Sequence, residues 1–236
     1  MRSHVLRFDK KKGKKMKKGI KRDLFISIGL VIAFAVWTLL LGVVDVKAIG
    51  PRGSSVGFAT INEFVHNLTG ANMNLYVITD WLGLVPIAVA FCFGIFGLAQ
   101  MIKRRSFLKV DRSILVLGGF YIVVMAVYVM FEFVVINRRP VLIEGILEAS
   151  YPSSTTMLVM CVMPTALMQL WSRIKAKAPR IIVATVILAF TAFMVIGRLI
   201  SGVHWVSDII GGAIISTGLV LTYKAVTNMV EEKKNI

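Results

Sequence analysis

The stretch RIIVATVILAFTAFMVIGRLISGVHWVSDIIGGAIISTGLVLTY, residues 180–223, contains two long apolar runs joined by a few polar residues. A helix needs about 20 apolar residues to cross a bilayer, and each run is close to that length. Three ionisable side chains, Arg198, His204 and Asp208, lie where the two runs meet. Ionisable residues at membrane depth are costly and are functional candidates by default. This stretch therefore predicts two membrane-spanning helices with a polar site at their junction.

The same apolar pattern recurs along the rest of the chain. The sequence is 57% hydrophobic, and its mean hydropathy of +0.78 lies far above that of a soluble domain. Apolar runs of spanning length occur at about 24–44, 77–101, 113–136, 152–172, 180–197 and 206–228. We therefore expect an all-α polytopic membrane protein with six transmembrane helices.

Basic residues are concentrated in particular connections between these runs. KRRSFLKVDR (103–112) and SRIKAKAPR (172–180) are strongly basic, as is the N-terminal segment. Basic loops remain on the cytoplasmic side, so both termini and these two loops are expected to be cytoplasmic. The connections near 45–76, 137–151 and 198–205 then face outward. The net charge of +16 is explained by this topology, and we expect no nucleic-acid partner.

The charge pattern also divides the chain into parts. Residues 1–23 form a basic cytoplasmic tail, which we expect to be disordered on anionic headgroups. Residues 24–228 form the six-helix membrane domain, and 229–236 form a second cytoplasmic tail. The first apolar run lacks a small-residue cleavage site, so it is interpreted as a spanning helix rather than a signal peptide. A bacterial plasma membrane is the expected location.

The longest outward connection contains a second, shorter pattern. Apolar residues recur there at helical spacing, namely Phe58, Ile61, Phe64, Val65 and Leu68. A short helix with one apolar face is typical of a segment that lies in the membrane interface. We therefore predict a short amphipathic helix in this connection.

The outward connections also carry residues suited to phosphate chemistry. His204 and Asp208 are four residues apart and share a helix face, so the carboxylate can hold the imidazole Nδ1–H and leave Nε2 as a nucleophile. Arg198 is suited to bidentate contact with an oxyanion, and Arg139 in EFVVINRRP (132–140) adds positive charge. These residue types favour a phosphoryl-transfer site.

The segment YPSSTT, residues 151–156, adds a helix N-terminus to this group. Proline followed by Ser153 and Ser154 is typical of the first turn of a helix, and free N–H groups there bind phosphate. A zinc site would need further His, Cys or carboxylate ligands nearby, so no metal and no cofactor are expected. Cys92 and Cys161 both fall in apolar runs and are interpreted as buried thiols.

At these residues the sequence resembles the type 2 phosphatidic acid phosphatases, whose core is shared with the vanadium haloperoxidases. That family carries three motifs: Lys, six residues, Arg-Pro; then Pro-Ser-Gly-His; then Ser-Arg, five residues, His, three residues, Asp. The third motif is matched by Arg198, His204 and Asp208, with Gly197 in place of Ser. The resemblance implies that His204 attacks phosphorus and forms a phosphohistidine, and that Asp208 orients it. It further implies that the phosphoryl oxygens are held by Arg139, Arg198, Ser153 and nearby backbone N–H groups.

The other two motifs are altered. Glu132 stands where the first motif has Lys, and it should repel phosphate unless it is protonated or paired with Arg138, Arg139 or Arg198. Thr155 stands where the second motif has His and cannot act as a general acid, a loss that costs about 10²–10⁴-fold in rate. The loss matters least when the leaving group is a phosphate, which favours a diphosphate substrate or a substitute acid. Candidates for that acid are Glu144, Glu148 and His66.

Together these patterns favour an integral-membrane lipid phosphatase, or a phosphotransferase, with its active site at the outer membrane face. Its partner would be a phosphorylated membrane lipid, either a lipid monophosphate or a prenyl diphosphate. The altered positions Glu132 and Thr155 leave one alternative open, a catalytically impaired relative that binds a phosphorylated lipid or a partner protein. The two hypotheses differ in whether phosphate is released.

Overall fold

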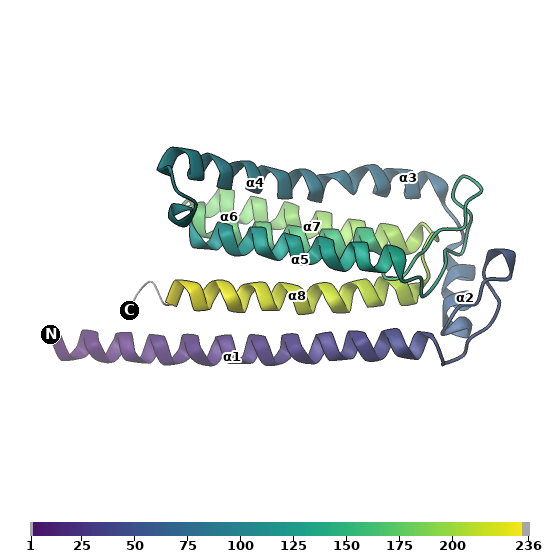
Figure 1. Cartoon of the computed structure of the whole chain (residues 1–236), viewed down its shortest axis with the longest axis horizontal. Coiled ribbons are helices and arrows are strands. Elements are labelled where there is room, and N and C mark those ends of the chain that lie inside the picture. The colour runs from purple at the N-terminus through teal and green to yellow at the C-terminus, as the bar shows by residue number, and fades with distance from the viewer. Residues whose placement is uncertain (1, 233–236) are drawn as a thin grey trace.

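The computed structural model describes the backbone of residues 2–232 and the side chains of residues 16–232. Figure 1 shows a bundle of roughly parallel and antiparallel helices. The α-helices are α1 (Arg2–Leu41), α2 (Ala59–Thr69), α3 (Met73–Leu82), α4 (Leu84–Arg104), α5 (Arg112–Phe133), α6 (Ser154–Arg173), α7 (Lys177–Ile200) and α8 (Val206–Glu232). Two short 3₁₀ turns, η1 (Pro51–Gly53) and η2 (Phe107–Lys109), lie in the connections. The predicted all-α fold is confirmed.

Six of the helical segments have the length and apolar composition needed to cross a membrane. They are Met16–Leu41, Met73–Arg104, Arg112–Phe133, Ser154–Arg173, Lys177–Ile200 and Val206–Glu232. The six predicted spans are therefore confirmed. Several helices extend beyond the apolar runs because lysine, arginine and glutamate are good helix formers and continue a helix past its last apolar residue.

The basic N-terminal segment differs from the prediction. Helix α1 begins at Arg2, so the backbone of residues 2–23 is helical rather than disordered. Only two glycines, Gly13 and Gly19, interrupt a segment rich in lysine, and extending an existing helix costs much less than nucleating one. The helix therefore runs without interruption from residues 2–23 into the first span. At the other end, α8 continues to Glu232, and the last four residues of the predicted tail lie outside the described residues.

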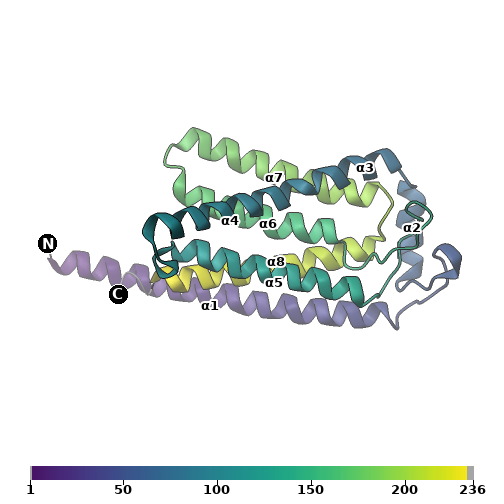
Figure 2. The same ribbon diagram turned by 45° about the horizontal axis from the view of Figure 1, so that its top comes forward.

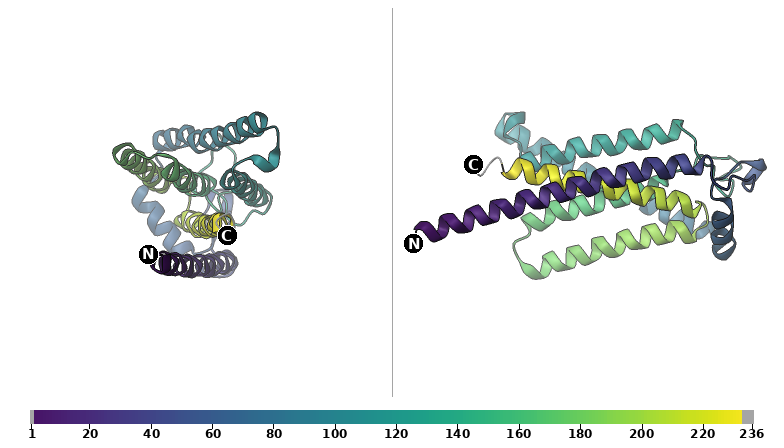
Figure 3. Two further views of the ribbon diagram at one scale, coloured as in Figure 1. Left: turned by 90° about the vertical axis from the view of Figure 1, so that its left-hand side faces the viewer. Right: turned by 90° about the horizontal axis from the view of Figure 1, so that it is seen from below.

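The helices are arranged around α8. Figures 1 and 3 show α1 lying along one side of α8, while α3 and α4 form a broken rod on the opposite side of the bundle. Helices α5, α6 and α7 fill the space between them, as Figure 2 shows from a second angle. A serine and a glycine allow α1 to approach α8 closely, because Ser27 Oγ donates to the carbonyl of Gly218 at 2.8 Å.

An aromatic cluster fixes the end of the bundle that is opposite the termini. The ring of Tyr151 stacks on Phe34 of α1, with 6.0 Å between centroids, and meets the edge of Phe131 of α5 at 5.8 Å. Its hydroxyl lies 2.7 Å from Thr38 Oγ1. Tyr151 is only 2% exposed, so the loop between α5 and α6 is anchored in the core at this residue.

Helix α3 is held against α7 by close packing. A Cβ at Gly197 of α7 would lie 2.9 Å from Thr79 Cγ2 of α3, so this contact requires glycine. The second span is interrupted at Gly83, between α3 and α4, and the N–H of Gly83 bonds to the carbonyls of Thr79 and Asp80. The break and the packing together place the last turns of α3 beside the end of α7 that carries Arg198.

The short helix predicted in the first long connection is present as α2. Three of its predicted apolar residues, Ile61, Phe64 and Leu68, are strongly exposed. Its opposite side is buried through Asn62, whose Nδ2 donates to the carbonyl of Gly57 at 2.7 Å and to Ser207 Oγ at 2.9 Å. Helix α2 thus contacts the start of α8 through Asn62, and its apolar residues face outward.

Candidate active site

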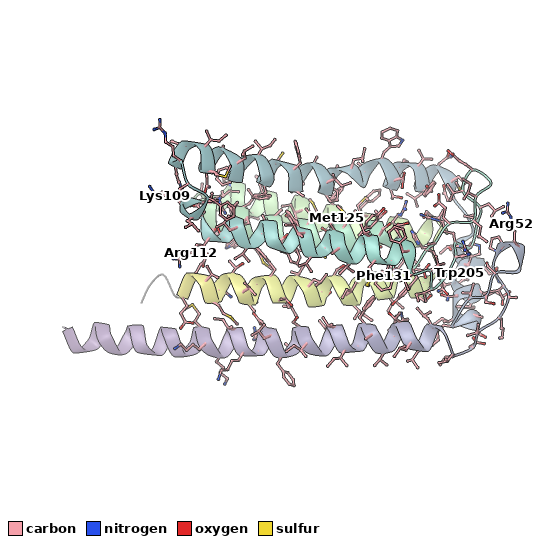
Figure 4. All side chains as sticks on the ribbon, in the orientation of Figure 1. Arg52, Lys109, Arg112, Met125, Phe131 and Trp205 are labelled. Atoms are coloured by element: carbon pink, nitrogen blue, oxygen red, sulfur yellow. The ribbon has the colours of Figure 1, made fainter. Side chains whose placement is uncertain are left out.

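A polar cavity of about 550 Å³ lies at the end of the bundle opposite the two termini. Its walls come from α3, α5, the loop between α5 and α6, the first turn of α6, the end of α7 and the loop before α8. In Figure 4, Phe131, which lines this cavity, lies toward the end opposite the one that carries Lys109 and Arg112. Among the sequence-predicted residues, Arg139, Arg198, His204, Ser154, Thr155 and Glu132 all line it.

His204 lies in the short connection between α7 and α8 and is 3% exposed. Its Nδ1 lies 3.1 Å from the carbonyl oxygen of Ser150, and its Nε2 lies 3.4 Å from Nη1 of Arg139. Burial, together with the positive charges of Arg139 and Arg198, holds the pKa of His204 well below its ordinary value. A neutral imidazole that donates from Nδ1 to Ser150 keeps the lone pair of Nε2 toward the cavity.

Asp208 lies behind His204 and does not line the cavity. Its Oδ2 is 3.7 Å from His204 Nδ1, farther than the Ser150 carbonyl. The carboxylate accepts from the backbone N–H of Trp205 at 3.0 Å and from Asn137 Nδ2 at 3.2 Å. Asp208 is fully buried. In this geometry it fixes the loop that carries His204, while the direct partner of the imidazole is the Ser150 carbonyl.

The two arginines converge on the ring of Tyr76 from α3. The guanidinium carbon of Arg198 lies 5.1 Å from the ring centroid, and that of Arg139 lies 5.9 Å from it. Arg198 is 1% exposed, and its buried Nε has no hydrogen-bond partner. A buried guanidinium nitrogen without a partner is unusual and marks a position where a ligand could accept a hydrogen bond.

Both arginines already have acidic neighbours. Nε of Arg139 forms an ion pair with Glu148 Oε2 at 2.9 Å. Nη1 of Arg198 lies 3.5 Å from Asp80 Oδ1 and 3.4 Å from Thr79 Oγ1. Sequence reasoning missed Tyr76, Thr79 and Asp80, although an aspartate inside the apolar run of the second span is a signal that could have found this wall.

The first turn of α6 assigns different tasks to its two serines. Ser153 is the N-cap, and its Oγ accepts from the N–H of Thr156 at 3.4 Å. Its own N–H donates to the carbonyl of Asp208, and the residue is fully buried outside the cavity lining. Ser154 and Thr155 line the cavity instead. The structure therefore gives Ser153 a capping role, and Ser154 is the serine that a ligand in the cavity would contact.

The altered position Glu132 lies at the end of α5 and lines the cavity. Arg139 and Arg198, its two expected arginine partners in the cavity wall, are paired with Glu148 and Asp80. The third, Arg138, donates from Nη1 to the carbonyl of Leu147 at 2.9 Å. The pairing of Glu132 with an arginine that could offset its charge is therefore not observed.

The three acids considered as substitutes for Thr155 are differently placed. Glu148 lines the cavity, whereas Glu144 and His66 do not. His66 lies on α2, where its ring packs against Trp205 with 5.5 Å between centroids. Within residues 16–232 no group of three or more His, Cys, Asp and Glu side chains is placed to hold a metal ion.

Two comparisons with known proteins found similarity to this chain. The model of the PAP2 superfamily matches residues 132–232, the segment from Glu132 through α8. One solved structure is similar, described as the first transmembrane PAP2 type phosphatidylglycerolphosphate phosphatase from Bacillus subtilis. The two share 19% sequence identity with a TM-score of 0.49, over 89% of this chain and 97% of the other. A comparison with curated proteins gave no match.

Proposed function

We propose that the chain is an integral-membrane lipid phosphatase of the PAP2 superfamily, a proposal supported by the match of the superfamily model to residues 132–232. The observation that carries the proposal is the buried His204, which lines a cavity together with Arg138, Arg139 and Arg198 and whose Nε2 lies 3.4 Å from Nη1 of Arg139. A lone pair held in position beside cations is what nucleophilic attack on a phosphoryl group requires.

The proposed reaction has two steps. Nε2 of His204 attacks phosphorus, the bond from phosphorus to the leaving oxygen breaks, and a phosphohistidine remains. Water then attacks this intermediate, which releases inorganic phosphate and returns the electron pair to Nε2. Arg139 and Arg198 stabilise the negative charge on the phosphoryl oxygens, and Ser154 with the free N–H groups of the first turn of α6 supports them.

Two elements hold the nucleophile in place. The Ser150 carbonyl accepts from Nδ1–H and selects the tautomer with an unprotonated Nε2, which lies 3.4 Å from Nη1 of Arg139. Asp208 keeps the connection before α8 in shape through the N–H of Trp205. The catalytic set is therefore His204, Asp208 and Arg198, with Arg139 and Ser154 at the phosphate; Ser153 acts as the helix cap.

The substrate is a phosphorylated membrane lipid, and Thr155 favours a diphosphate among the candidates. A phosphate leaving group needs less protonation than an alkoxide does, so the missing acid at Thr155 costs least with a prenyl diphosphate. A phosphotransferase would use the same phosphohistidine and replace water with an acceptor hydroxyl. A catalytically impaired binder of phosphorylated lipid is the competing proposal.

We place the cavity at the outer face of a bacterial plasma membrane. The basic connections at 103–112 and 172–180 lie at the same end of the bundle as both termini, and basic segments favour the cytoplasm. The membrane domain of the proposal spans residues 24–228, flanked by the basic segment 1–23 and by 229–236. Labelling of a single cysteine introduced at Arg52, beside the cavity end, by an impermeant reagent in intact cells tests this orientation.

The decisive test is phosphate release by purified protein in detergent. Lipid monophosphates and prenyl diphosphates are supplied side by side to the wild type, to His204→Ala and to His66→Ala. The proposal expects release that is lost in His204→Ala and retained in His66→Ala, because His66 does not line the cavity. Release that survives in His204→Ala would refute the mechanism. Lipid binding without release by folded wild-type protein would support the binding protein instead.

A further inference from the structure

The cavity beside His204 is unusually rich in acidic side chains for a phosphate site. Three arginines line it, Arg138, Arg139 and Arg198, and three carboxylates line it as well, Asp80, Glu132 and Glu148. The formal charges of these six side chains cancel, and His204 is neutral. A ligand that is only an anion would therefore enter a site with no net positive charge.

Two of these carboxylates have basic partners within the protein. Glu148 is paired with Arg139 at 2.9 Å, and Asp80 lies 3.5 Å from Arg198. Glu132 differs from both, because none of the ion pairs among the described side chains includes it. Glu132 therefore lines the cavity without a basic side chain within ion-pairing distance among the described residues.

A second observation is that two residues lining the same cavity have buried polar atoms without hydrogen-bond partners. Arg198 is 1% exposed, and its Nε is buried without a hydrogen-bond partner. Ser150 is 3% exposed and also lines the cavity, and its Oγ has no partner either. Buried polar groups without partners are rare in folded proteins. Donors on one wall and a free carboxylate on another fit a ligand that has both an anionic and a cationic group.

Tyr128 strengthens the case for a cationic group near Glu132. It lies four residues before Glu132 on α5, so the two side chains share a helix face, and both line the cavity. The face of a tyrosine ring attracts an ammonium ion. A carboxylate next to an aromatic ring is a suitable receptor for an ammonium group and a poor one for phosphate.

Resting on the proposed function, we infer that, between lipids with the same number of phosphate groups, the site prefers those whose headgroup also carries an ammonium group. The phosphoryl group lies against Arg139, Arg198 and His204, and the ammonium group lies against Glu132 and Tyr128. A cavity of about 550 Å³ falls within the range of small-molecule sites, about 300–1,000 Å³, and has room for both groups.

Two matched probes test this inference by direct binding. In 2-aminoethyl phosphate an ammonium group occupies the position that a methyl group occupies in n-propyl phosphate. Calorimetry with purified protein in detergent should show that the wild type binds 2-aminoethyl phosphate about fivefold more tightly, the upper range for a solvent-accessible ion pair. Glu132→Gln should reduce this ratio to about one, and Glu132→Lys should reverse it. Glu144→Gln is the control, since Glu144 lies outside the cavity.

The outcomes are distinct. Equal binding of the two probes by the wild type, or a preference that Glu132→Gln leaves unchanged, would overturn the inference. If Mg²⁺ strengthens binding of n-propyl phosphate in the wild type but not in Glu132→Gln, without an ammonium preference, the carboxylate serves a metal ion and the inference is wrong. Glu132→Gln keeps the size of the side chain, and an unchanged unfolding temperature verifies its fold. Because this test compares the binding of two phosphates, whereas the His204→Ala test measures whether phosphate is released, either inference can fail while the other stands.

Discussion

Replacing Gly211 with alanine should displace Tyr151 and thereby disturb the active site. Gly211 lies in α8, and an added Cβ would be 2.4 Å from Cε2 of Tyr151 and 2.8 Å from its hydroxyl oxygen. The ring cannot retreat easily, since it is packed between Phe34 and Phe131 and its hydroxyl lies 2.7 Å from Thr38 Oγ1. Overpacking of this kind costs about 1–3 kcal/mol.

The same change should also slow catalysis. Ser150, whose carbonyl accepts from His204 Nδ1, directly precedes Tyr151, so a displaced ring moves the support of the proposed nucleophile. A misplacement of about 1 Å in an active site can cost about 100-fold in rate. We expect Gly211→Ala to unfold at a lower temperature and to release phosphate at about one hundredth of the wild-type rate.

Thermal unfolding in detergent, followed by intrinsic fluorescence, and phosphate release measure the two effects. Gly118→Ala is the matched control, because a Cβ at Gly118 of α5 has no atom within 4 Å. Alanine is favoured over glycine inside a helix by roughly 0.5–1 kcal/mol, so this control should be as stable as the wild type or slightly more so. If Gly211→Ala matches Gly118→Ala in both assays, the reasoning about Tyr151 is wrong.

Three further predictions concern the site itself. Because the pKa of His204 is lowered in the folded protein, the imidazole is protonated at a higher pH in the unfolded chain than in the folded one. Stability should therefore fall as the pH drops below about 6.5, by up to about 1.4 kcal/mol per pH unit, and His204→Asn should lose this slope in unfolding measured across pH. Arg198→Lys keeps the charge but loses the planar fork, and should lower kcat by about 10²–10³-fold; a rate near wild type would contradict its role at the phosphate. Ser153→Ala should lower the free energy of unfolding by about 1 kcal/mol because a helix cap is lost, whereas Ser154→Ala should weaken phosphate binding. If unfolding and binding assays give the reverse pattern, Ser153 contacts the phosphate instead.

The spans and part of the site could be predicted from local sequence patterns. Hydropathy identifies a spanning helix because the membrane imposes one length and one composition on it. Arg198 and His204 lie at the ends of one short connection, so their proximity follows from the chain itself. Arg139 could be assigned to the same site because it matches the first of the three family motifs, which occur in the family's order along the chain.

Other features had no local signal. The partner of His204 Nδ1 is the backbone carbonyl of Ser150, and a carbonyl group is present in every residue. Asp80 meets Arg198 because α3 packs on α7, a contact between residues 118 positions apart that no spacing rule covers. The helical start of α1 depends on propagation from the adjoining span, which composition alone does not reveal.

Helix α3, the first part of the broken rod, supplies one wall of the site, whereas the reacting groups come from a later part of the chain. Arg139, Arg198, His204 and Asp208 all belong to the segment 132–232. Tyr76 and Asp80, which lie against the two arginines, come from α3, outside that segment. The reacting groups and one wall of the cavity thus come from two different segments of the chain. Exchange of residues 73–104 as a block could therefore retune which headgroup is accepted while the chemistry stays intact.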